Sequence, residues 1–190
     1  MLRVLLAGAV VCFAAFASGR QHQFALRDTR NVVHPSEEWN GKKAVVVFFT
    51  TTDCPLSNNV VPEMNRTRRD YEARGVAFYA VQADTTIADS DVVQHTKEYK
   101  FSFPVLFDPK QVLVKMTGAT TIPEAAVLSS DGNLLYLGRI DNRVEDFDKR
   151  RPEPTQFDLR EALDAVLAGK PVAHARTKAF GCAINQVNGR

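Results

Sequence analysis

Cysteine and histidine are both scarce in this chain of 190 residues, which has three of the first and four of the second. None of the four histidines stands at a ligand-like spacing from a cysteine, so we expect surface histidines and no metal site or other cofactor. A marked excess of one charge is lacking too, because the formal net charge is +2 and the basic runs are short. The chain therefore offers no argument for nucleic acid or an anionic membrane surface as a partner.

A long hydrophobic run is also missing, since spanning a bilayer takes about 20 apolar residues. The longest run, 4–16, is about 13 residues long, follows Arg3 and ends at the small-x-small sequence Ala15-Phe16-Ala17. This pattern predicts a secretory signal peptide over 1–17, cleaved near Ala17, and export to the periplasm or outside the cell. An uncleaved membrane anchor is the alternative.

Removal of this segment takes Cys12 away and leaves Cys54 and Cys182 as the only pair. In an oxidising compartment such a pair is either a disulfide or a redox couple. With 45% hydrophobic residues, the rest of the chain is long enough for one domain with a full core. We expect a lead-in at 18–40, one domain at 41–169 and a tail at 170–190 without periodicity that carries Cys182.

The order of predicted elements is typical of an α/β domain with a mixed sheet. The unbroken apolar run 44–49 predicts a buried strand, and Pro55 opens a helix that contains Pro62 and ends at Gly75. The other predicted elements are a strand at 76–81, a helix at 88–100, an extended piece at 103–108, a hairpin of 125–128 with 134–140, a charged excursion at 142–157 and a helix at 158–168 capped by Asp158.

Four segments in this order resemble the thioredoxin superfamily, and more narrowly its redoxin group of alkyl hydroperoxide reductase and thiol-specific antioxidant relatives. They are the active-site segment 48–57, Pro62 inside the following helix, the segment 103–108 and Thr121-Ile122-Pro123. The resemblance covers 41–169 and implies a three-layer sandwich with a mixed central sheet flanked by helices. It places the reactive thiol at Cys54, and Pro123 at the cis-proline that shapes the substrate groove.

The chain also departs from this family's patterns. Ser57 stands where thioredoxins have their second cysteine, which excludes a dithiol within one motif. Thr51 matches the threonine of peroxiredoxins, but Val47 replaces their proline, and the Thr-Ile-Pro segment falls where they have an arginine.

A thiol at the start of a helix is well placed to react as the thiolate, because unpaired N–H groups and the helix dipole favour the anion. Thr51 and Ser57 offer hydroxyls to the sulfur of Cys54, while an inward-facing Asp53 would oppose its ionisation. Cys182 is a candidate resolving cysteine; a static disulfide and pairing between chains are the alternatives. We expect Arg139 and Asp141 to form a surface ion pair.

These features predict an exported thiol-based oxidoreductase in which Cys54 acts on a protein disulfide or a peroxide and an unidentified thiol supplies the electrons. The first alternative is a thiol peroxidase of peroxiredoxin type. The second is a binding module that keeps the fold without turnover, as the serine at position 57 would allow.

Overall fold

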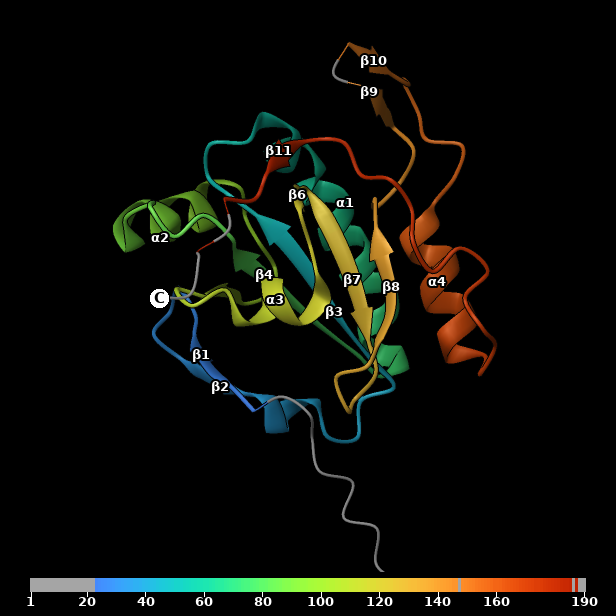
Figure 1. The fold of residues 1–190 in the computed structure, drawn as a ribbon, viewed down its shortest axis with the longest axis horizontal. Coiled ribbons are helices and arrows are strands. Elements are labelled where there is room, and N and C mark those ends of the chain that lie inside the picture. Colours follow the sequence, from blue (N-terminus) through green and yellow to red (C-terminus); the bar gives the residue numbers. More distant parts are fainter. Residues whose placement is uncertain (1–22, 147, 186, 188–190) are drawn as a thin grey trace, which may run out of the picture.

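A five-stranded mixed sheet forms the centre of the computed structural model, which describes residues 23–146, 148–185 and 187 (Figure 1). The predicted signal segment 1–17 lies outside these residues. The strand order is β5-β4-β3-β7-β8, with β3 parallel to β4 and antiparallel to β7. The five strands are β3 (Ala44–Thr50), β4 (Val76–Gln82), β5 (Val105–Phe107), β7 (Glu124–Leu128) and β8 (Leu134–Gly138).

The central strand β3 is buried along its whole length, as its unbroken apolar run predicts. Phe48 and its neighbours on one face pack against helices α1, α2 and α4, while Phe49 on the other face packs with α3 and the N-terminal segment. The predicted three-layer thioredoxin-like sandwich is thus confirmed. The helices are α1 (Pro55–Tyr71), α2 (Asp89–Glu98), α3 (Val112–Thr117) and α4 (Asp158–Leu167). None of the described helices is long and apolar enough to cross a membrane.

Helix α1 begins and ends as its sequence indicates. Pro55 is its first residue, Cys54 is its N-cap, and Pro62 lies inside it. A short 3₁₀ turn, Glu72–Arg74, leads to Gly75, whose φ of +93° is a conformation that glycine adopts freely.

Three expectations about charged side chains are wrong. Asp158 does not cap α4, because Phe157 is the N-cap and the Asp158 carboxylate instead accepts from Arg139 Nε at 2.7 Å. Arg139 is therefore paired with Asp158 rather than with Asp141. Two of the histidines are buried: His34 lies between the Asp28 and Glu38 carboxylates, and His95 packs on aromatic rings.

Within the described residues, three small two-stranded sheets accompany the central sheet. In the described part of the lead-in, β1 (Ala25–Arg27) pairs with β2 (Val33–Pro35), and a 3₁₀ turn over Ser36–Trp39 adds Trp39 to the core. The charged excursion forms the hairpin β9 (Val144–Asp146) and β10 (Lys149–Arg150), which projects from the body in Figure 1. The third sheet pairs β6 (Thr121–Ile122) with β11 (Cys182–Ala183).

The tail has a defined course that its lack of periodicity did not predict. Residues 175–185, here called the strap, run from the edge strand β8 across to β6 (Figure 1). Leu137 N donates to Ala175 O at 2.9 Å, and Arg176 bridges to Leu137. The tail thereby brings Cys182 back to the start of α1.

Candidate active site

Cys54 lies where the central strand gives way to the first helix, and its side chain is completely buried. Its Sγ donates to the carbonyl oxygen of Ile122 at 3.4 Å. Ile122 is the last residue of β6 and is joined to Pro123 by a cis peptide bond, so Pro123 occupies the cis-proline position next to this contact.

Cys182 reaches Cys54 from the far end of the chain. The two Sγ atoms are 2.7 Å apart although 128 positions separate the residues, and both are free thiols. A disulfide needs about 2.05 Å between its sulfurs. Bond formation therefore requires only a small approach of the two side chains.

Backbone pairing holds Cys182 in this position. Cys182 stands opposite Ile122 in the β6–β11 register, and Ile184 N donates to Thr120 O at 2.9 Å. Further along, the buried side chain of Gln111 donates to Asn185 O at 2.8 Å. The strap therefore binds the same short strand whose carbonyl contacts Cys54.

The approach of the strap depends on Gly181. A Cβ atom at this position would lie 1.7 Å from the carbonyl oxygen of Ile122, a backbone atom that cannot rotate away. Upstream, Thr177 Oγ1 lies 2.7 Å from the hydroxyl of Tyr136 and accepts from Arg139 N at 3.1 Å. These contacts fix the strap on both sides of Phe180.

Sequence reasoning did not single out Glu124, which follows Pro123. Its buried carboxylate accepts from the backbone N–H groups of Thr120 and Thr121, at 3.0 and 3.3 Å. Burial raises the pKa of this carboxyl, and the two N–H groups oppose the rise. The signal available in the sequence was a charged residue directly before the apolar run 125–128. Glu124 is a positioning residue for the loop that carries the Cys54 contact.

The side chains of Thr51 and Ser57, which were predicted to offer hydroxyls to the sulfur of Cys54, are both buried. Neither makes a hydrogen bond to that sulfur within the described residues. Thr51 Oγ1 accepts from Gln82 Nε2 at 3.3 Å. Ser57 Oγ is fully buried and has no hydrogen-bond partner within the described residues. Asp53 is exposed and accepts from Thr52 Oγ1, so its carboxylate does not face inward.

Replacing Ser57 by alanine measures what the buried hydroxyl without a partner costs in stability. We expect Ser57→Ala to raise the free energy of unfolding of the reduced protein by about 1 kcal/mol, because a buried hydroxyl without a partner is costly. Urea denaturation of the reduced protein measures this change. A loss of stability would mean that the hydroxyl is hydrogen-bonded after all.

Cys182 is held in its neutral thiol form by its surroundings. Burial raises the pKa of Cys182 to about 11, and the hydrogen bond to Cys54 together with the charge on that sulfur adds to the rise. Because a raised pKa favours the neutral thiol, Cys182 keeps its proton at neutral pH and can donate it to the sulfur of Cys54.

The raised pKa of Cys182 predicts a pH dependence for alkylation of the reduced protein. We expect the rate at Cys182 to climb only above pH 9, toward a midpoint near the pKa of about 11, because only the thiolate reacts. In Cys54→Ser the midpoint should fall but stay above that of a free cysteine, since burial is the largest cause of the shift. Iodoacetamide labelling with peptide mapping measures both. Identical midpoints in the two proteins would contradict the contact between the thiols.

Comparison with known sequences finds relatives that are named thiol-disulfide oxidoreductases. Residues 18–151 match the family model described as Redoxin. Thiol-disulfide oxidoreductase ResA of Bacillus thuringiensis subsp. konkukian is 30% identical over 93 residues, 49% of this chain and 53% of that protein. ResA of Halalkalibacterium halodurans is 25% identical over 127 residues, 65% of this chain and 70% of the relative. The chain thus spans about half the length of the first of these curated relatives.

Solved structures show the same fold over a larger share of the chain. A hypothetical protein from Sinorhizobium meliloti 1021 has a TM-score of 0.76 at 27% identity, covering 90% of this chain and 94% of its own. A putative thiol:disulfide interchange protein DsbE from Chlorobium tepidum has a TM-score of 0.61 at 22% identity, covering 78% and 95%. The second likeness supports the fold alone.

Proposed function

Because this chain belongs to the redoxin family, we propose that it is a thiol-dependent oxidoreductase that exchanges disulfides through Cys54 and Cys182. The observation that carries the proposal is the 2.7 Å contact between the two Sγ atoms. Further support comes from Gly181, since a strap built only to cover the core would not need so close an approach to Ile122.

The cycle begins with the Cys54 thiolate at the N-terminus of α1. It attacks one sulfur of a substrate disulfide, the substrate's S–S bond breaks, and the second substrate sulfur leaves and takes up a proton. Cys182 then loses its proton and attacks Cys54 Sγ, which releases the first substrate sulfur as a thiol. The products are a reduced substrate and an oxidised Cys54–Cys182 pair, and two reducing thiols restore the dithiol.

Access to Cys54 requires movement of the strap, because Cys54 is fully buried while Cys182 is only half-buried. Strand β11 is two residues long, so few backbone hydrogen bonds need to open. We assign Ser57 as a donor to the Cys54 sulfur while it is charged, Thr51 as a second hydroxyl behind it, and Pro123 as a wall of the substrate groove.

The test compares two oxidants on the reduced protein. We expect 2-hydroxyethyl disulfide to convert both thiols to a linked pair, with no such conversion of Cys54→Ser. Hydrogen peroxide at equal concentration should react more slowly than the disulfide. Faster reaction with peroxide would favour a thiol peroxidase, the alternative suggested by Thr51 three residues before Cys54. If the protein reacts with neither oxidant, the exchange function is wrong and the alternative of a binding module without turnover is favoured.

We also propose that the protein acts after export, on the basis of the apolar run and the small-x-small sequence that ends at Ala17. Expression of the full chain in a bacterial host should yield a mature protein that begins at Ser18. N-terminal sequencing measures this, and an N-terminus at Met1 in an exported fraction would contradict cleavage.

A further inference from the structure

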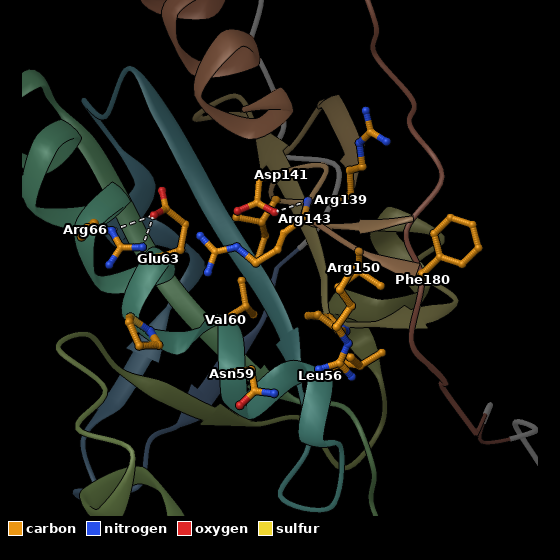
Figure 2. Close-up of a pocket in the computed structure, with 14 residues that line it drawn as sticks. Leu56, Asn59, Val60, Glu63, Arg66, Arg139, Asp141, Arg143, Arg150 and Phe180 are labelled. Carbon is orange, nitrogen blue, oxygen red and sulfur yellow. Dashed lines mark hydrogen bonds and ion pairs between the residues drawn. The ribbon is translucent and has the colours of Figure 1, made fainter. Parts of the chain in front are cut away.

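A pocket of about 180 Å³ lies between α1, the segment 139–144 that follows β8, and the strap (Figure 2). Leu56, two residues after Cys54, and Phe180, two residues before Cys182, both line it, and Val60 contributes to its apolar wall. One end of the pocket therefore adjoins the cysteine pair, and a compound held here could extend from the pocket to the reacting sulfurs.

Two buried polar atoms of this pocket have no partner within the described residues. Asp141 is 9% exposed; its Oδ1 accepts from the backbone N–H of Arg143 at 2.8 Å, while Oδ2 is buried and unpartnered. The Nε of Arg143 is likewise buried without an acceptor. One acceptor and one donor, both charged, are thus left unused in one pocket.

The charged side chains near Asp141 and Arg143 determine which groups remain available to a ligand. Arg66 is paired with Glu63, and the nearest carboxylate to the guanidinium of Arg143 is Glu153, at 3.8 Å. Arg150 of β10 also lines the pocket, from the projecting hairpin (Figure 2). The pocket therefore offers one buried carboxylate oxygen and two guanidinium groups to a ligand.

The chemistry of these groups specifies the ligand. A buried carboxylate oxygen without a donor is costly, and an ammonium group would satisfy it. Burial raises the pKa of Asp141, with Glu63 and Asp158 adding to the rise and Arg143 opposing it. Guanidinium groups bind carboxylates through charge-assisted hydrogen bonds. An ammonium and a carboxylate on one carbon atom form the head group of an α-amino acid.

The distance along α1 sets the length of the ligand. Asp141 lies near enough to Glu63 for the charge of Glu63 to raise its pKa, and Glu63 is nine residues beyond Cys54, which corresponds to about 13 Å along the helix axis. Free cysteine is too short to place its head group in the pocket and its sulfur at Cys54. A γ-linked peptide thiol, whose α-amino-acid head group is separated from the sulfur by an extended spacer, has about the required reach.

We propose that this pocket binds the α-amino-acid head group of a small γ-linked peptide thiol, which is the reductant of the oxidised pair. The inference rests on the proposed exchange function. The first thiolate attacks Cys54 Sγ, the Cys54–Cys182 bond breaks, and Cys182 leaves and takes up a proton. A second thiolate attacks the ligand sulfur of the mixed disulfide and releases Cys54. Two small thiols are oxidised to one disulfide, and the protein gains two thiols.

The test runs this reaction backwards with four disulfides on the reduced full-length protein. Oxidised glutathione carries both head-group charges. The glutaryl-Cys-Gly disulfide lacks the ammonium, the 4-aminobutyryl-Cys-Gly disulfide lacks the α-carboxylate, and 2-hydroxyethyl disulfide lacks both. We expect oxidised glutathione to react at least about 10-fold faster than either peptide analogue, because each charge forms a charge-assisted bond.

Two variants assign the charges to residues. Asp141→Asn should slow oxidised glutathione about 10-fold and leave the glutaryl analogue unchanged, while Arg143→Gln should slow oxidised glutathione and leave the aminobutyryl analogue unchanged. Arg69→Gln, at an exposed position of α1 outside the pocket, serves as the control and should change none of the rates.

The outcomes separate this inference from the function on which it rests. Equal rates for oxidised glutathione and its two analogues would overturn the head-group site while leaving exchange intact, and so would variants that slow all four disulfides by one factor. If 2-hydroxyethyl disulfide also fails to oxidise the protein, the exchange function itself is wrong.

Discussion

Cys54→Ser is expected to lower disulfide exchange more than about 1,000-fold, to the level of the uncatalysed reaction, because the hydroxyl that replaces the thiol is not a nucleophile at neutral pH. Cys182→Ser is expected to behave differently. Its Cys54 still attacks the substrate, but no second thiol follows, so a mixed disulfide between Cys54 and the substrate accumulates. Mass spectrometry of acid-quenched reactions with a disulfide-containing protein measures both.

The two serine variants serve as controls for each other, because each keeps the shape of the side chain and removes one sulfur. Equal loss of activity without a trapped intermediate in Cys182→Ser would contradict the order of attack. Accumulation of a substrate adduct on Cys182 in Cys54→Ser would assign the first attack to the half-buried thiol of the strap instead.

Gly181→Ala is expected to slow formation of the Cys54–Cys182 bond about 100-fold, because displacement of a reacting group by about 1 Å can cost this much. The new Cβ would lie 1.7 Å from Ile122 O, so the strap must withdraw from β6 and carry Cys182 away. The core should remain intact, since the pairing that is lost involves two residues of β11. Stopped-flow oxidation with alkylation quenching measures the rate.

Gly118→Ala is the matched control for this variant. Gly118 has a φ of +72° and open space around its Cα, so alanine there strains the backbone without touching the strap. It should reduce stability and leave the rate of bond formation unchanged. A rate for Gly181→Ala equal to that of Gly118→Ala would mean that the position of the strap does not set the reactivity of the pair.

Much of the fold follows from local patterns that can be recognised directly in the sequence. The apolar run 44–49 can be buried only on both faces of a sheet, and Pro55 fits the first position of a helix because its missing N–H costs nothing there. The turn before β8 contains Gly132, which has a φ of +86°. These rules place Cys54 between the central strand and the first helix, and the position of one thiol of the pair was therefore predictable.

The rest of the site depends on contacts that have no local signature. The strap is held by backbone pairing with a two-residue strand and by one close approach at Gly181, and neither produces a period in the sequence. Asp158 fits a helix cap by residue type, yet Arg139 offers it a stronger charged partner. The buried atoms of Asp141 and Arg143 that have no partner within the described residues lie in the segment between β8 and the projecting hairpin, and their burial depends on packing that leaves no local pattern in the sequence.

The central claim is that Cys54 and Cys182 form one redox couple, and equilibration of the full chain in thiol–disulfide buffers of graded potential tests it most directly. After quenching and alkylation, peptide mapping should reveal a single two-electron transition between two alkylated cysteines and one peptide that joins Cys54 to Cys182. A Cys182 that remains alkylated at every potential while Cys54 is oxidised would contradict the account.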